Sequence, residues 1–229
     1  MLTVPGLCWL CRMPLALSRW GICSVCTRSL QWRIGICPQC GLPATNPSLP
    51  CGRCLKKSPP WSALVAVDDY VPPLSRLIHA LKFSGQSSLA QPLARLLLLL
   101  LAVLQARRHR ALPKIDRVVN VPLYRRRHWR RGYNQSDLIC RPLARWLGCQ
   151  YDARALTRVH ATAIQHQLSA RLRKRNLKNA FRLELPVDGL HIAIVDDVVT
   201  TGSTVAELSR LLLQSGAASV QVWCLCRTL

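Results

Sequence analysis

The stretch Ile192-Ala-Ile-Val-Asp-Asp-Val-Val-Thr-Thr-Gly-Ser-Thr204 predicts more about this chain than any other. Its four leading apolar residues indicate a buried central strand, and Asp196 and Asp197 follow at the carboxyl end of that strand. A turn of small residues comes next and leads into a helix. Because open α/β sheets bind ligands outside the carboxyl ends of their strands, the stretch predicts a binding site on such a sheet.

The turn after this acidic pair carries groups that suit a phosphate. Its hydroxyls belong to Thr200, Thr201, Ser203 and Thr204, and Gly202 permits close approach of a ligand to the backbone. Backbone N–H groups at the start of the following helix would also face the phosphate. The acidic pair can accept hydrogen bonds from two vicinal ribose hydroxyls. Together these groups predict a clamp for ribose 5-phosphate.

Two acids before a helix can also do no more than cap it. The chain has a second adjacent pair, Asp68-Asp69, and no hydroxyl-rich turn follows that one. Other nucleotide-binding and metalloprotease patterns are missing from the sequence, which has no GxxxxGK[ST], no GxGxxG and no HExxH. The ribose-phosphate interpretation therefore depends on strand, acids and hydroxyl-rich turn occurring together.

Outward from this stretch, the sequence alternates between short apolar runs and longer helical patterns, which is typical of a parallel α/β sheet. Strands are expected at Ala63–Val67, Arg117–Val121, His191–Val195 and Val220–Leu225. Helices are expected from Pro92 to about Ala106, from Asn134–Ser136 to Gly148, and from about Thr204 to Ser215. The first of these helices is rich in leucine, which predicts a buried helix and leaves a membrane-surface helix as the alternative.

Eight of the twelve cysteines lie in the first 54 residues as four Cys-x-x-Cys pairs. These pairs are Cys8/Cys11, Cys23/Cys26, Cys37/Cys40 and Cys51/Cys54. Two such turns can direct four thiolates at one tetrahedral zinc ion, so the block predicts two structural zinc sites in tandem zinc ribbons. We expect sequential sites, the first four cysteines and then the last four; the spacing also fits a cross-braced arrangement. The remaining cysteines are expected in the core: Cys140, Cys149, Cys224 and Cys226.

A polar, proline-containing segment, Leu55-Lys-Lys-Ser-Pro-Pro60, follows the last of the paired cysteines. We therefore expect a zinc-ribbon domain at 1–58 and an α/β domain at 59–229. A disulfide scaffold would need an oxidising compartment, and the beginning of the sequence does not have the pattern of a signal peptide. The longest apolar run, Leu96–Leu104, has nine residues, too few to span a bilayer. The expected location is the cytoplasm, with peripheral attachment to the inner membrane left open.

The order of motifs along the whole chain resembles the competence protein F (ComF) family, including its GntX branch. The Cys-x-x-Cys repeats are followed by three motifs, Leu77-Ile-His-Ala-Leu-Lys-Phe-Ser-Gly85, Val119-Asn-Val-Pro-Leu-Tyr-Arg-Arg-Arg127 and Arg131-Gly-Tyr-Asn-Gln135. Residues 192–204 then resemble the phosphoribosyl pyrophosphate (PRPP) loop of type I phosphoribosyltransferases. One departure is Tyr124-Arg125, where the family usually has His-Pro after Val-Pro-Leu.

The resemblance implies a type I phosphoribosyltransferase-like parallel sheet with helices on both faces, beside a small double zinc ribbon. It implies PRPP binding by the acidic pair and residues 200–204, with the acidic pair catalytic and Mg²⁺ as cofactor if the protein is active. It implies a pyrophosphate loop that contains the basic residues Arg125, Arg126 and Arg127. It implies a mobile loop that contains Gln165, Arg171, Arg173, Lys174 and Arg175.

Arginine supplies most of the positive charge. Lys and Arg together number 32 against ten acidic residues, a formal net charge of +22, and 26 of the 32 are Arg, whose planar donor fork suits phosphate oxygens. The segment Arg125–Arg131 interleaves five arginines with His128 and Trp129, which suits single-stranded nucleic acid through neutralisation and base stacking. Arg107–Arg110 and Arg171–Arg175 add two basic clusters. Solvated arginines at the start of a helix are the plainer alternative.

Three functions stay open. The first, which we favour, is an accessory protein for uptake or use of external DNA that binds PRPP and single-stranded DNA and works with the DNA-uptake machinery. The second is an active nucleobase phosphoribosyltransferase, although no segment clearly predicts the hood that would recognise a base. The third is a nucleic-acid or protein adaptor whose PRPP fold is not catalytic.

Overall fold

A computed structural model describes residues 6–30, 35–106, 114–123, 129, 131–159 and 180–228. Its centre is a five-stranded sheet in the order β1-β7-β6-β2-β3, in which every pair is parallel. The strands are β1 Ala63–Asp69, β7 Ser219–Arg227, β6 His191–Val199, β2 Arg117–Asn120 and β3 Gln150–Tyr151. Parallel neighbours require crossover connections, and helices supply them here.

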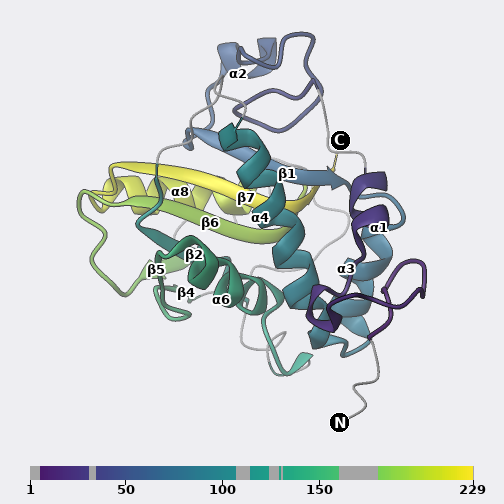
Figure 1. Cartoon of the computed structure of the whole chain (residues 1–229). Helices are drawn as coiled ribbons and strands as arrows, with labels where there is room; N and C mark the ends of the chain where they lie inside the picture. The colour runs from purple at the N-terminus through teal and green to yellow at the C-terminus, as the bar shows by residue number, and fades with distance from the viewer. Residues whose placement is uncertain are drawn as a thin grey trace.

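Helices cover both faces of this sheet (Figure 1). They are α3 Leu74–Phe83, α4 Ala90–Ala106, α6 Gln135–Leu147 and α8 Ser203–Gln214. Buried residues of α3, α4 and α6 form one apolar core with one face of the sheet, and α8 forms a second core with the opposite face. The expected α/β fold, a parallel sheet with helices on both faces, is confirmed.

Strand β6 shows why its sequence is apolar without interruption. Successive side chains of a strand point to opposite faces. Ala193 and Val195 lie in the core that contains α4, whereas Ile192 and Ile194 lie in the core that contains α8. All four are fully buried, as expected for a parallel strand covered on both sides.

Several elements differ from the sequence expectation in length or were not expected. β6 and β7 continue to Val199 and Arg227, because the two strands pair with each other to those residues. The antiparallel hairpin of β4 (Leu156–Arg158) and β5 (Phe181–Leu183) was not expected, and neither was β3. These strands have two or three residues each, too few for an apolar periodicity to be recognised in the sequence.

The leucine-rich helix α4 begins at Ala90, two residues before Pro92, and a 3-10 turn, η2 (Ser87–Leu89), precedes it. The span Ser87–Ala106 is long and apolar enough to cross a membrane, with a mean hydropathy of 1.8. Half of that window is nevertheless buried inside the protein, where α4 packs against α6, β1 and β7. The helix is thus part of the main core of the fold.

The N-terminal segment contains η1 (Ser18–Trp20), α1 (Ser24–Ser29) and α2 (Gly52–Lys56). Its two halves lie at different places: α1 lies beside α3, and α2 lies beyond β1 (Figure 1). Leu15 and Ile22 from the first half are buried in the same core as α4. The cysteines of the second half form a small apolar cluster of their own.

Candidate functional site

The eight N-terminal cysteines form two groups that are consecutive in the chain. The first cysteine set is Cys8, Cys11, Cys23 and Cys26; the second cysteine set is Cys37, Cys40, Cys51 and Cys54. The four Sγ atoms of each set lie within 4.8 Å of one another. Each set has the same local frame, since a β-bridge brackets the first Cys-x-x-Cys turn at Leu7↔Pro14 and again at Ile36↔Pro43. Such clusters could hold zinc ions.

The surroundings of the sulfur atoms fit a bound cation. Burial by itself would raise the pKa of Cys8, but hydrogen bonds from the backbone N–H groups of Cys11, Cys23 and Leu10 bring it down to about 6. Burial also raises the pKa of Cys37, but backbone hydrogen bonds outweigh it and lower that pKa to about 7. Burial raises the pKa of Cys26 and Cys54, and neighbouring thiols raise it further. In each set, therefore, one thiol loses its proton more readily than a free cysteine does. A bound divalent cation would favour the thiolate form of the other thiols as well.

The acidic pair lies where β6 extends beyond the end of its neighbour β2. The ladder between β2 and β6 ends at Asn120↔Val195, whereas the ladder between β6 and β7 continues to Val199↔Arg227. Asp196 and Asp197 therefore lie within β6 rather than after it, and no backbone of β2 pairs with them. This step between strand ends leaves room for a ligand at the carboxyl edge of the sheet, as expected for this class of fold.

Asp197 forms an ion pair that the sequence analysis missed. Lys82 Nζ, near the end of α3, lies 2.7 Å from Asp197 Oδ1, and the Asp197 residue is only 7% exposed. A carboxylate this buried needs such a partner to remain charged. Lys82 lies in the stretch Leu77–Gly85, which resembles its family counterpart, but its role could not be found from spacing because α3 and β6 are far apart in the chain.

Asp196 lies in a less favourable environment for a charge. Burial and the neighbouring charge of Asp197 raise its pKa to about 7, and Lys82 opposes both. Its Oδ1 accepts hydrogen bonds from Ser136 Oγ at 3.2 Å and from the backbone N–H of Asp197 at 2.9 Å. Ser136 is held there by the first turn of α6, where the Asn134 side chain accepts from the backbone N–H of Ser136.

The turn at residues 200–204, called the hydroxyl loop below, leads directly into α8. Gly202 has φ +77°, a left-handed conformation that favours glycine, and a Cβ there would lie 3.2 Å from the Trp61 ring. Thr201 Oγ1 and Ser203 Oγ are 2.8 Å apart. Within the described residues, no acid lies in the first turn of α8, and the side-chain bond to its first residue is long, from the backbone N–H of Ser203 to Thr201 Oγ1 at 3.4 Å. The N–H groups of this turn can therefore receive an anion.

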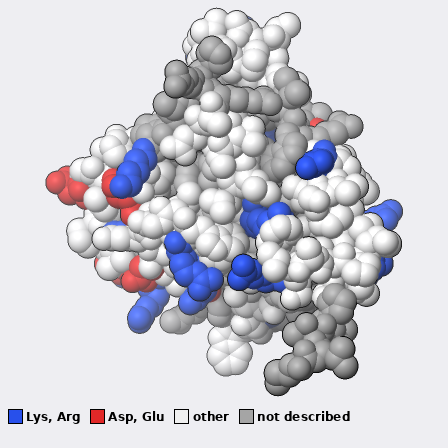
Figure 2. All heavy atoms as spheres, viewed as in Figure 1, with Lys and Arg blue, Asp and Glu red and all other residues white. Residues whose placement is uncertain are grey.

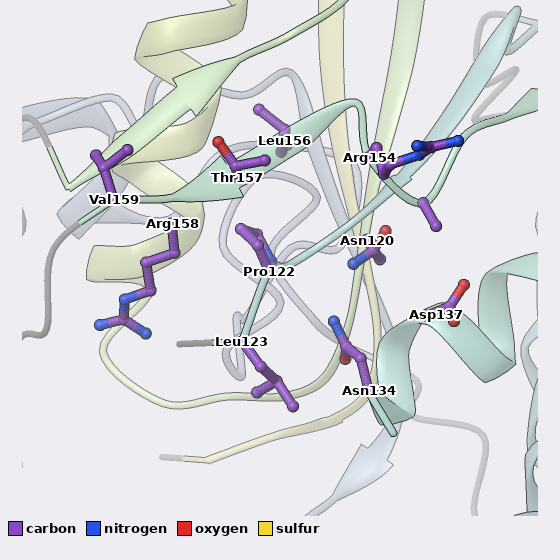
Figure 3. A pocket seen from close by; sticks show the side chains of 11 residues that line it. Asn120, Pro122, Leu123, Asn134, Asp137, Arg154, Leu156, Thr157, Arg158 and Val159 are labelled. Atoms are coloured by element: carbon purple, nitrogen blue, oxygen red, sulfur yellow. The ribbon is translucent and has the colours of Figure 1, made fainter. Parts of the chain in front are cut away.

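A pocket of about 700 Å³ lies beyond the end of β2, between the start of α6 and the strand β4 (Figure 3). Asn120 at the end of β2 and Asn134 at the start of α6 line it. Both amides are held in place, since Asn134 donates to the carbonyl of Val121 at 2.9 Å and Asn120 accepts from Tyr151 Oη at 3.1 Å. Arg154 and Arg158 also line the pocket and add positive charge, against the single acid Asp137 among the described lining residues. The pocket can therefore take a polar, anionic part of a ligand.

Similarity to known proteins shows the family to which the chain belongs. A family model described as "Phosphoribosyl transferase domain" matches residues 140–229. "DNA utilization protein YhgH" of Escherichia coli (strain K12) is 71% identical over 229 residues, which is 100% of both chains. "Competence protein F" of Haemophilus influenzae is 41% identical over 223 residues, 96% of each chain. The chain belongs to the competence protein F (ComF) family.

ComF membership confirms the resemblance found along the whole sequence. Among solved structures, adenine phosphoribosyltransferase from Saccharomyces cerevisiae is 18% identical, with a TM-score of 0.38 over 60% of this chain and 69% of that one. The sheet order, the domain match and the two cysteine sets together give a phosphoribosyltransferase-like domain with zinc-ribbon-like N-terminal sites.

Two groups of residues expected to contact the ligand lie outside the described part of the structure. They are the basic residues of the pyrophosphate loop, Arg125, Arg126 and Arg127, and those of the mobile loop, Gln165, Arg171, Arg173, Lys174 and Arg175. The described flanks are nevertheless informative. The pyrophosphate loop follows β2 directly, and the strands β4 and β5 pair on either side of the mobile loop.

Proposed function

We propose that this ComF protein binds PRPP, or a related ribose 5-phosphate, at the acidic pair and the hydroxyl loop. The observation that carries the proposal is the position of Asp196 and Asp197 beyond the end of β2, a short turn before the N-terminus of α8, whose first turn holds no acid. In this arrangement the two carboxylates accept hydrogen bonds from the ribose 2′ and 3′ hydroxyls. The hydroxyl loop and the first N–H groups of α8 hold the 5′-phosphate.

The pyrophosphate group is assigned to the β2 side of the acidic pair. The polar lining of the pocket there consists of the amides Asn120 and Asn134, two arginines, Thr157 and one acid, Asp137, and the expected basic loop follows β2. Mg²⁺ bound with the pyrophosphate would act as a Lewis acid and stabilise charge on the leaving group. Lys82 is the ion-pair partner of Asp197 at this site and holds that carboxylate in position.

The direct test is calorimetric titration of the full chain with PRPP and Mg²⁺. We expect saturable binding at one site, weaker binding of ribose 5-phosphate, and competition between the two. Absence of binding by both compounds contradicts the proposal. Release of pyrophosphate in the presence of individual nucleobases would further identify an active transferase, the alternative in which the acidic pair is catalytic.

Replacing Lys82 with methionine should shift the pH dependence of PRPP binding. Binding requires the ionised acidic pair, so affinity in the unmodified protein should rise as the pH increases through about 7, the pKa of Asp196. The positive charge of Lys82 lowers that pKa, and its removal raises the pKa. The midpoint of affinity against pH should therefore move upward in Lys82→Met. The exposed Lys114→Met is the matched control, and a midpoint that is the same in all three proteins contradicts the assignment.

We also propose that the protein binds single-stranded DNA, and one surface feature supports this second activity. A groove of about 690 Å³ lies where the first cysteine set meets the start of α4 and the outer face of α6. Arg19, Arg141 and Arg145 line it, together with Trp9, and no acidic residue does within the described part of the chain. Figure 2 shows Lys and Arg side chains at several separate places on this face, some of them over the region of α4 and α6, with Asp and Glu mainly at one edge. A nucleic-acid backbone and a stacked base suit this lining.

The double variant Arg19→Glu/Arg145→Glu should weaken binding of single-stranded DNA and flatten its salt dependence. Each phosphate contact contributes roughly 0.7 to the slope of log K against log salt, so loss of two contacts should reduce the slope by about 1.4. Filter binding across a salt series measures both quantities. Arg53→Glu/Arg182→Glu carries the same charge change at exposed positions away from the groove; equal effects of the two double variants would contradict a specific surface.

The two binding activities together support the role suggested by the relatives, whose names refer to DNA utilization and competence. A protein that binds incoming single strands would work beside the DNA-uptake machinery, in the cytoplasm or peripherally at the inner membrane. If PRPP does not bind but DNA does, the adaptor function with a non-catalytic fold is favoured instead. The expected division into a zinc-ribbon domain at 1–58 and a phosphoribosyltransferase-like domain at 59–229 remains part of this proposal.

A further inference from the structure

Arg227, the last residue of β7, connects the second cysteine set to the start of the hydroxyl loop. Its Nε donates to the carbonyl oxygen of Cys40 at 3.0 Å. Its Nη1 donates to the carbonyl oxygens of Val199, at 3.0 Å, and Thr200. The residue is only 7% exposed. One buried guanidinium therefore ties a metal-binding turn to the backbone from which the loop departs.

A second connection runs through Trp61, which is also buried. Its indole Nε1 donates to the carbonyl oxygen of Gln39, within the same Cys-x-x-Cys turn, at 2.5 Å. The far edge of its ring is the nearest group to the position that a Cβ on Gly202 would take, at 3.2 Å. Trp61 thus links Gln39 to Gly202, and Arg227 links Cys40 to Val199 and Thr200. The turn supports the loop from two sides.

The first cysteine set is attached to a different part of the fold. A Cβ on Gly21 would overlap the ring of Pro92 of α4 at 2.1 Å, which shows how closely the Gly21 backbone approaches that ring. Arg95 of α4 donates to the carbonyl oxygen of Ile22 at 3.1 Å and lies over the Trp20 ring. The two metal-binding sets therefore have separate anchors, α4 for the first and the β7–hydroxyl-loop junction for the second.

The geometry points to Arg227 as a positioning residue of the PRPP site, and to the second cysteine set, but not the first, as the metal site on which PRPP affinity depends. This inference rests on the proposed function. A bound metal fixes the Cys37–Cys40 turn and with it the carbonyl of Cys40. Without it the turn relaxes, Arg227 loses a partner in a buried environment, and the loop carbonyls lose their fixed donor. The loop then samples conformations that do not bind phosphate.

Cys54→Ser and Cys26→Ser form a matched pair for the test, because each removes the last ligand of one set and neither residue contacts Arg227 in the bonds above. Native mass spectrometry should find one zinc in each variant and two in the unmodified protein. Calorimetry should show PRPP affinity about tenfold lower, or more, in Cys54→Ser, and near the unmodified value in Cys26→Ser. Arg227→Lys keeps the charge but loses the planar set of guanidinium donors. Its PRPP affinity should be lowered as in Cys54→Ser, although both zinc ions are retained.

The unmodified protein provides a readout that does not depend on the folding of any variant. Coupling between two binding equilibria is reciprocal, so PRPP should raise the zinc affinity of the second cysteine set by the same factor, which is measured as resistance to zinc removal at equilibrium with a competing chelator. We expect one of the two zinc ions to be protected in the unmodified protein, and the single zinc of Cys26→Ser, but not that of Cys54→Ser, to be protected. Protection of neither ion, or of both equally, overturns the inference while PRPP binding stands. Failure of PRPP to bind the unmodified protein overturns the proposed function itself.

Discussion

Asp196→Asn/Asp197→Asn should abolish detectable PRPP binding. An amide accepts more weakly than a carboxylate and no longer balances the Mg²⁺ that accompanies the ligand. Each hydrogen bond from a ribose hydroxyl to a charged acceptor contributes roughly 1.5–3 kcal/mol, so loss of both should weaken binding by about two to four powers of ten. Calorimetric titration with PRPP and Mg²⁺ measures the loss directly.

The chain offers a matched control for this double substitution. Asp68 and Asp69 are also adjacent, lie at the end of β1, and have no hydroxyl-rich turn after them. Asp68→Asn/Asp69→Asn therefore makes the same chemical change at the same edge of the sheet and should leave PRPP affinity near the unmodified value. Retained affinity in the Asp196/Asp197 variant, or equal loss in both variants, would contradict the proposed site.

Complete removal of zinc should unfold the N-terminal segment and lower the melting temperature of the whole protein. Structural zinc sites of this kind contribute roughly 10–16 kcal/mol of binding free energy, which so small a segment cannot replace from its own core. Circular dichroism during heating, with metal content measured on the same samples, follows both changes. A metal-free protein that melts at the same temperature would contradict structural zinc.

The two cysteine sets should differ in how they affect stability. Leu15, Ile22 and Leu30 from the first half of the segment are buried in the main core with α4, whereas the second set has a small cluster of its own. Cys26→Ser should therefore lower the melting temperature more than Cys54→Ser does. With the expected PRPP affinities, the first set would mainly determine stability and the second would mainly determine ligand binding.

Much of the fold could be predicted because the relevant information is local. Four of the five strands of the main sheet, the cap at Asn134 and the left-handed residue Gly148 after α6 follow from patterns a few residues long. The strands with two or three residues, β3, β4 and β5, could not be predicted. Their positions depend on pairing partners elsewhere in the chain rather than on their own composition.

The same division applies to the candidate site. Asp196, Asp197 and the hydroxyl loop stand in one short stretch, so their chemistry was apparent from the sequence. Their partners were not. Ser136 is 60 residues away from Asp196 in the chain, and Lys82, which pairs with Asp197, comes from α3, far earlier in the chain. No spacing rule relates such residues, because a crossover connection can have any length.

The sequence alone carries the groups on which the proposed chemistry depends: eight thiols in Cys-x-x-Cys turns, an acidic pair after an apolar strand, and a hydroxyl-rich turn before a helix. Each is a contiguous pattern, because its residues must act on one ion or one ligand from a single turn. The tertiary structure decided which of these units support one another. Cys40 and Arg227 are 187 residues apart, and only the parallel packing of β7 beside β6 and β1 brings the second cysteine set close to the hydroxyl loop.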